Sequence, residues 1–323
     1  MLHGTLWDKI PRFAVPVAAT AILSQLFNAA DIAVIGNFTG ELRTVAVAAV
    51  GTNSSIISLI VNLFIGIALG ANVTIAHAIG EKNDTMVHHA VHTSIVVAVL
   101  GGLIAAIIGE QSAMFSIANI VIQGAINSLG TVVMAASSAA YNIEVITYDI
   151  LNSFSQACTT FVGQNFGAGE IKRCKKTLLL CLLEGIISLG VAIALILFFG
   201  KSLLTIFNGD PQVVETGYIR LMLIMPSHLF SLCYEVLSGY LRGFEISLPP
   251  AVLTMLGVCG VRLSWLRWVF PQYKTFMNIM LVFPISLATT ALLMLAAVLY
   301  FRPSRRYAHL QKSDGAASAK IEG

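Results

Sequence analysis

Residues 177–200 read TLLLCLLEGIISLGVAIALILFFG, an apolar run of 24 residues that carries one charged side chain, Glu184. At a rise of about 1.5 Å per residue, a helix of this length crosses the hydrocarbon core of a bilayer. Similar runs recur at roughly 10–35, 45–78, 90–109, 113–140, 143–166, 212–241, 248–270 and 276–301. The sequence therefore predicts an all-α, polytopic membrane protein with about nine transmembrane helices.

The composition agrees with this fold class. Of the 323 residues, 57% are hydrophobic and 11% are charged, whereas soluble domains are about 25% charged. The mean hydropathy is +0.83. The net charge of +3 is too small to indicate a nucleic-acid partner, and the five scattered cysteines do not form a disulfide framework.

An internal repeat is visible at an offset of 87 residues. The segment LRTVAVAA at 42–49 returns as LGTVVMAA at 129–136, with five of the eight positions identical. The same offset places AHAIG at 76–80 on GQNFG at 163–167. Chance similarity between apolar helices is the alternative, but the register holds at both ends of the span. Duplicated halves are common in secondary transporters, and the substrate path usually runs between them.

The charged loops create a conflict of topology. Basic residues cluster at 170–176 and at 302–306, and positive loops tend to lie in the cytoplasm. Nine spans would place the two termini on opposite sides of the membrane. The second repeat copy also begins at Gly109–Ser112 without room for its first helix. We expect the strain to lie at 109–115, between the runs 90–109 and 113–140.

Several short motifs resemble transporters of the MATE (multidrug and toxic compound extrusion) class. The resemblance covers nearly all of residues 8–302, and the order and spacing of the motifs are more specific than any one of them. The motifs are Pro16, QLFNAAD at 25–31, VIG at 34–36, AAVG at 48–51, Gly66, Gly70, AHAIG at 76–80, GQNFGAG at 163–169 and GYLRG at 239–243.

The resemblance implies two parallel six-helix bundles, from which helices four to six of the first bundle are missing here. We therefore expect a partial N-terminal bundle of three helices at 1–110, a C-terminal six-helix bundle at 111–303 and a disordered cytoplasmic tail at 304–323. A real deletion and an assembly artefact are equally compatible with this pattern.

Asp31 is the strongest candidate for ion coupling, because it lies about 20 residues into the first span and a mid-bilayer carboxylate is costly. Gln25, Asn28 and Asp31 follow one another at intervals of three, so they share one helix face. In the family, the acid of this helix helps to bind the driving proton or cation. A structural cap or ion pair near the interface is the alternative.

The second bundle supplies candidates for a substrate cavity. Asp149 and Asn152 lie one turn apart, and Tyr234 and Glu235 lie in the middle of the span 212–241, which in the family contributes to the cavity of the C-terminal bundle. Interhelical hydrogen bonding is the alternative role for these side chains. The glutamate that sodium-coupled members carry early in helix seven is absent, so no cation site is assigned to this bundle.

His88, His89 and His92 include an i, i+4 pair, but no further ligands complete a metal site, and we expect no metal. No Walker loop or Rossmann fingerprint is present, so we expect no cofactor and no enzyme activity, with energy coming from an ion gradient.

The sequence thus predicts a secondary active multidrug efflux transporter, a monomer in the inner (cytoplasmic) membrane, which exchanges protons or sodium for amphipathic or cationic organic compounds. A lipid-linked or polysaccharide flippase and an inactive truncated transporter remain alternatives. In-span basic residues are few (Arg220, Arg262, Arg267), which favours the drug exporter over the flippase.

Overall fold

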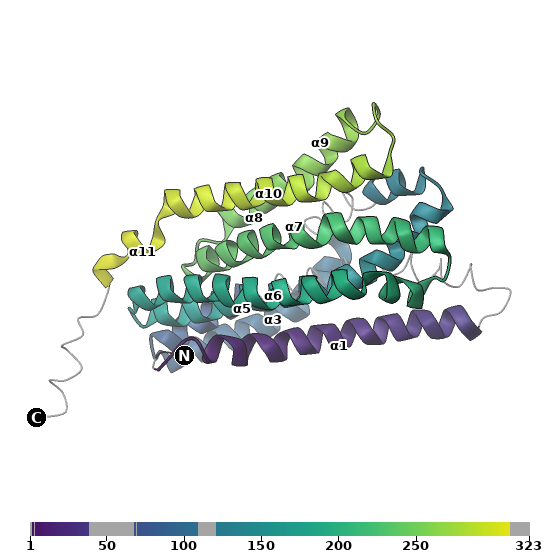
Figure 1. Cartoon of the computed structure of the whole chain (residues 1–323). Coiled ribbons are helices and arrows are strands. Elements are labelled where there is room, and N and C mark those ends of the chain that lie inside the picture. Colours follow the sequence, from purple (N-terminus) through teal and green to yellow (C-terminus); the bar gives the residue numbers. More distant parts are fainter. Residues whose placement is uncertain (1, 3, 39–67, 69, 109–120, 311–323) are drawn as a thin grey trace, which may run out of the picture.

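The computed structural model describes residues 2, 4–38, 68, 70–108 and 121–310, and among these it describes the side chains of all but 28–38, 97–108 and 310. Within these residues all regular structure is helical (Figure 1). Long helices lie roughly side by side along one axis of the molecule.

The first part of the chain contributes helix α1 (Lys9–Phe38), a helical segment at 70–80, and helix α3 (Asp84–Ile108). Ile10, Ala14 and Ala18 are buried, and they recur every four residues on one face of α1. Two of the three are alanines, whose small side chains allow a close approach, and α1 packs mainly against α5.

Three long helices form the centre: α5 (Thr131–Gly167), α6 (Ile171–Phe207) and α7 (Pro211–Gly243). Gly130, with φ 105°, adopts a left-handed conformation that favours glycine, and α5 begins directly after it. Helix α7 begins where the Asp210 carboxylate accepts a hydrogen bond of 2.8 Å from the backbone N–H of Gln212. Pro211 takes the first helical position, where its missing N–H is not needed.

The last part is one helical segment with an inserted wide turn, followed by a straight helix. The segment comprises α8 (Leu248–Thr254), the π-helix η2 (Met255–Gly260) and α9 (Val261–Trp268). Helix α10 (Phe276–Phe301) packs against α7 and against this segment. It begins at the Thr275 hydroxyl, which accepts from the backbone N–H of Asn278 at 3.3 Å.

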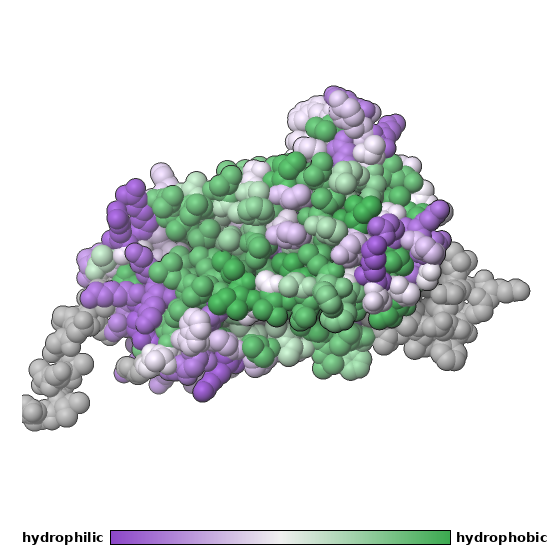
Figure 2. Space-filling model, in the orientation of Figure 1, coloured by the Kyte–Doolittle hydropathy of each residue, from purple (hydrophilic) through white to green (hydrophobic). Residues whose placement is uncertain are grey.

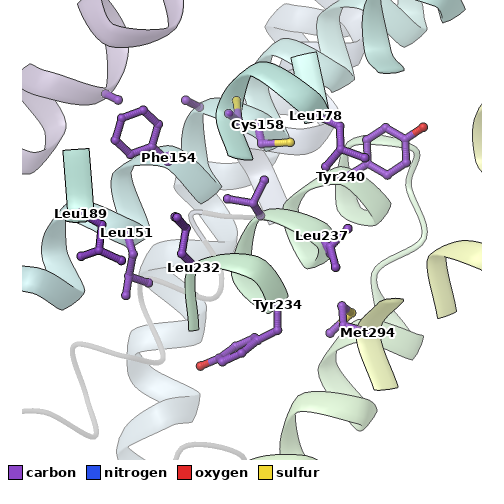
Figure 3. Packing of buried hydrophobic residues seen from close by; sticks show 14 of the residues in the cluster. Leu151, Phe154, Cys158, Leu178, Leu189, Leu232, Tyr234, Leu237, Tyr240 and Met294 are labelled. Carbon is purple, nitrogen blue, oxygen red and sulfur yellow. The ribbon is translucent and has the colours of Figure 1, made fainter. Parts of the chain in front are cut away.

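The main hydrophobic core lies between α5, α6 and α7, where Leu151, Phe154, Leu189 and Leu232 point into a common interior (Figure 3). Gly185 permits this packing, because a Cβ atom there would lie 2.9 Å from a methyl group of Leu232. Ile10 and Ala14 of α1 belong to the same core, so α1 and the central helices form one packed unit.

The surface shows how the protein meets a bilayer. Apolar residues cover the middle of the molecule, and polar residues gather toward its two ends (Figure 2). Within the described residues, five helices are long and apolar enough to cross a membrane: Lys9–Phe27, Ile171–Phe207, Pro211–Gly243, Leu248–Trp268 and Phe276–Arg306. Phe198 of α6 and Tyr300 of α10 are about four-fifths exposed, at 79% and 80%, which suits side chains that face lipid.

The structure differs from the expected spans at one place. The runs 113–140 and 143–166 are not separated near residue 141, because α5 is continuous from Thr131 to Gly167. The break lies at Gly130 instead, after a shorter helical segment at 121–127. Residues 109–115, where we expected the strain, lie outside the described part of the chain.

Contacts of the described helices place the two basic segments at the same end of the molecule. Arg173 at the start of α6 donates to the backbone carbonyl of Gly4, with both distances 3.2 Å, so the N-terminus lies at this end of the molecule. Tyr307 lies at the same end, with its ring 5.0 Å from that of Phe166. Gly4 and Tyr307 therefore lie at one end of the molecule, as the positive charge of the segments 170–176 and 302–306 predicts.

The beginning of the expected tail is ordered. Pro303–Arg306 forms the short helix α11, and Ala308–Leu310 forms a single 3-10 turn. Residues 311–323 lie outside the described part of the chain.

Candidate functional site

Gln25, Asn28 and Asp31 lie on the second half of α1. The side chain of Gln25 is half-buried, while its neighbours Leu26 and Phe27 are exposed. The side chains of Asn28 and Asp31 lie outside the described part of the chain, so the expected coupling site stays a prediction.

Asp149 and Asn152 lie on α5, and both are half-buried. The Oδ2 atom of Asp149 is buried and accepts no hydrogen bond from the described residues. An unpartnered carboxylate oxygen is unusual inside a protein, because buried polar atoms usually have a hydrogen-bond partner. The role of Asp149 and Asn152 in lining a substrate cavity stays a prediction.

Tyr234 and Glu235 lie on α7, where Tyr234 is buried and Glu235 is half-buried. Arg242 lies two turns further along α7 and places its Nη2 atom 3.8 Å from the Glu235 carboxylate and 3.1 Å from the Ser155 hydroxyl. The Ser155 hydroxyl in turn donates to the backbone carbonyl of Glu235 at 2.8 Å. The Glu235 carboxylate thus lies near an arginine of its own helix, and its backbone carbonyl takes part in the contact that joins α7 to α5. The cavity role of Tyr234 and Glu235 stays a prediction.

The strongest ionic contact of the described residues joins two side chains that the sequence left apart. The Arg220 guanidinium binds the Glu144 carboxylate through both oxygens, at 2.6 and 2.8 Å. The two side chains are only 5% and 7% exposed, so water does not screen the pair. One turn beyond Glu144, the Thr147 hydroxyl lies 2.6 Å from Nδ1 of His228. A buried polar network therefore crosses from α5 to α7.

Glu184 and Arg262 are two further charged side chains that lie within apolar spans of the sequence. Glu184 on α6 is 5% exposed, and neither carboxylate oxygen has a hydrogen-bond partner in the described residues. Arg262 on α9 places its guanidinium 4.6 Å from the centre of the Phe283 ring, and its Nε donates to the Ser286 hydroxyl at 3.2 Å. Ionisable residues inside a span are rare and usually functional, so the sequence signal for both was their depth.

The two repeat copies meet directly at one end of the molecule. A Cβ atom on Gly80 would lie 2.1 Å from the carbonyl oxygen of Gln164, and one on Gly167 would lie 2.1 Å from that of His77. Further into the molecule, the Asn72 amide donates to the Thr160 hydroxyl at 2.9 Å. Only glycine permits this approach, so the exits of the two repeated helices form a closed contact.

Aromatic side chains from several helices surround this contact. The ring of Phe166 lies 5.1 Å from His77, 4.8 Å from Phe244 and 5.0 Å from Tyr307. His77 Nδ1 also lies 3.6 Å from the Glu245 carboxylate. The segment 70–80, α5, α7 and the C-terminal turns therefore converge here, and we call this the closed end.

His88, His89 and His92 are all exposed on α3. Within the described residues, His, Cys, Asp and Glu side chains form no group of three or more that could hold a metal ion.

A family model described as MatE matches the chain twice, at residues 16–112 and 111–265. The two matches correspond to the two repeat copies, they meet at the expected seam, and the first is the shorter one. "Probable multidrug resistance protein NorM" of Chromobacterium violaceum is 28% identical over 153 residues, which is 46% of this chain and 33% of that protein. Human "Multidrug and toxin extrusion protein 1" is 28% identical over 130 residues, 40% of this chain and 23% of that protein.

This chain thus matches a third or less of the length of these two relatives. Among solved structures, the "Outward-facing conformation of a multidrug resistance MATE family transporter of the MOP superfamily" aligns with a TM-score of 0.74. The alignment covers 97% of this chain and 98% of that chain at 13% identity, which shows a shared fold. The chain belongs to the MatE family, whose members are multi-pass membrane transporters and not enzymes.

Proposed function

We propose that this chain is a secondary active exporter that exchanges protons or sodium ions for amphipathic organic compounds, cationic ones included, by alternating access. The observation that carries the proposal is the closed end, where Gly80 and Gly167 bring the two repeat copies into backbone contact. Alternating access needs two repeat units that separate at one end of the molecule while they meet at the other.

The distribution of charge supports an orientation in the inner membrane. The basic segment 170–176 and the arginines at 302, 305 and 306 all lie at the closed end. Because positive loops favour the cytoplasm, the closed end faces the cytoplasm and the opposite end faces outward. The proposed partners are therefore the lipid bilayer and a small organic substrate that leaves on the outer side, with the chain acting as a monomer.

The proposed coupling site is Asp31, with Asn28 and Gln25 on the same face of α1. A carboxylate at this depth favours its neutral form and becomes charged only with a bound cation or with water. Asp149 and Asn152 of α5 and Tyr234 and Glu235 of α7 are the proposed lining of the substrate cavity. The names of the relatives, which refer to multidrug resistance and toxin extrusion, support this substrate class.

The direct test is efflux of ethidium, a cationic dye, from cells that express the chain in the inner membrane. We expect faster efflux than from control cells, loss of efflux when a protonophore and a sodium ionophore collapse the gradients, and loss of efflux with Asp31→Asn. Efflux equal to that of control cells, at confirmed membrane expression, would contradict the proposal and identify a member that does not transport.

A further inference from the structure

Arg262 carries a charge that the described residues do not neutralise. It lies on α9 directly after the π-helix η2, and it is half-buried. Its guanidinium donates a hydrogen bond of 3.2 Å to the Ser286 hydroxyl and lies 4.6 Å from the centre of the Phe283 ring. No carboxylate of the described residues lies within ion-pair distance of its guanidinium.

The nearest acid is already engaged. Glu144 uses both oxygens to bind Arg220, and the Arg220 guanidinium lies 5.4 Å from the centre of the same Phe283 ring. Two guanidinium groups therefore flank one aromatic ring, and a single carboxylate serves one of them. Of these three side chains, Arg262 is therefore the one that has no charged partner among the described residues.

An uncompensated charge at this depth is costly for the folded protein. Arg262 lies six residues before the end of α9, which places it about 9 Å inside the segment. A guanidinium carries five N–H donors in a planar fork, and the contacts to Ser286 and Phe283 use one donor and one face. The remaining donors match the two oxygens of a carboxylate or the oxygens of a phosphate.

The surrounding backbone holds Arg262 in place. A Cβ atom on Gly257 would lie 2.3 Å from the Thr290 hydroxyl, so η2 sits directly against α10. Thr290, Ser286 and Phe283 follow one face of α10, and the last two are the residues that Arg262 contacts. The inserted π-turn alters the register of the segment just before Arg262, and such turns occur frequently at functional sites.

We propose that Arg262 forms an anion subsite in the C-terminal bundle, which binds the carboxylate of an amphipathic, aromatic compound during export. The inference rests on the proposed function and extends its substrate class to amphipathic compounds that also carry an anionic group, zwitterions included. The Arg220–Glu144 pair is neutral as a unit, so of the two arginines at the Phe283 ring Arg262 is the one whose guanidinium has no carboxylate partner among the described residues.

The test uses two dyes that differ in one group. Rhodamine B carries a free carboxylate, and in its ethyl ester the carboxylate is masked while the aromatic cation is retained. The full chain is placed in phosphatidylcholine nanodiscs, and binding is followed by fluorescence anisotropy. We expect Arg262→Gln to weaken rhodamine B binding about tenfold, as for the loss of a charge-assisted hydrogen bond, and to leave the ester unchanged. Arg262→Lys should retain part of the affinity.

The control variant is Arg267→Gln, which removes an exposed arginine from the same helix and should bind both dyes as the wild type does. Equal binding of rhodamine B by the wild type and Arg262→Gln would overturn the subsite. So would an equal loss for both dyes, which indicates structural damage. Nanodiscs rich in phosphatidylglycerol distinguish the source of the anion, because competition with rhodamine B in the wild type but not in Arg262→Gln would support the subsite with a lipid phosphate as its occupant.

This assay measures binding and not transport, so its outcome is independent of the exporter proposal. Selective loss of rhodamine B binding with no dye efflux from cells would keep the subsite and contradict the exporter. Efflux of ethidium with no selective loss of rhodamine B binding in Arg262→Gln would support the exporter and contradict the subsite.

Discussion

Gly80 and Gly167 are equivalent positions in the two repeat copies, 87 residues apart, and each lies against the backbone of the other copy. Gly80 approaches Gln164, and Gly167 approaches His77, which are themselves separated by the same offset. The contact is therefore related by an approximate two-fold symmetry. A symmetric contact at one end of two repeat units is the geometry expected of a gate that closes on that side.

A methyl group at either glycine should open this contact. Gly167→Ala places a Cβ atom 2.1 Å from the His77 carbonyl oxygen, a distance that requires the helices to move apart. Overpacking of this kind costs about 1–3 kcal/mol. We expect a lower melting temperature in detergent and greater accessibility of a cysteine at position 77. Gly190→Ala is the matched control, because nothing lies within 4 Å of its Cβ position, and it should change neither quantity. A melting temperature unaffected by Gly167→Ala would refute the tight contact.

The buried pair Glu144–Arg220 should behave unlike the exposed pair Lys201–Glu215. Removing one member of a buried pair leaves an isolated charge, and Glu144→Gln should destabilise the fold by about 3–5 kcal/mol. Lys201→Gln breaks an ion pair of 2.6 Å between side chains that are 55% and 60% exposed, and it should cost about 0–1 kcal/mol.

A double-mutant cycle built from the single variants Glu144→Leu and Arg220→Met measures the coupling of the buried pair directly. We expect the double variant Glu144→Leu with Arg220→Met to recover most of the stability lost by either single variant, because neither charge remains. Additive losses in thermal unfolding would mean that the two side chains act independently.

Replacing Glu184 should stabilise the fold, whereas replacing Glu144 should destabilise it. Both of its carboxylate oxygens are buried without a partner in the described residues, and an unsatisfied buried polar group costs about 1–3 kcal/mol. Glu184→Met keeps the approximate shape and removes the unsatisfied atoms, so it should raise the melting temperature of the purified protein. A substantial decrease would show that the carboxylate has a stabilising partner.

The arrangement of the helices predicts which loops share a side of the membrane. On a background without Cys158, Cys174, Cys181, Cys233 and Cys259, single cysteines at Asn83, Lys172 and His309 should react with a membrane-impermeant reagent from the cytoplasmic side only. Cysteines at Asn208 and Tyr273 should react from the outer side only. Labelling of positions 83 and 172 from opposite sides would rule out the common closed end.

Much of this architecture can be predicted from the sequence. The hydropathy pattern predicts the helices, and the repeat at an offset of 87 residues predicts the duplication. The repeat alignment places Gly130 near the beginning of the repeated segment 129–136, and its positive φ explains why α5 begins there. The expected spans missed this break, since apolar letters continue across it and the turn signal at Asn127–Gly130 is short. Pairs such as Glu144 with Arg220 were not predictable, because 76 residues separate them and only the packing register of α5 against α7 brings them together.

The central claim is that this chain moves an organic compound across a membrane by using an ion gradient. The most direct measurement is ethidium movement in proteoliposomes that contain only the purified full chain, under an imposed proton gradient or an imposed sodium gradient. We predict dye movement that one of the two gradients drives, that stops when the gradient is collapsed, and that Asp31→Asn abolishes at equal protein content. Dye movement no faster than in protein-free liposomes, under both gradients, would contradict the account.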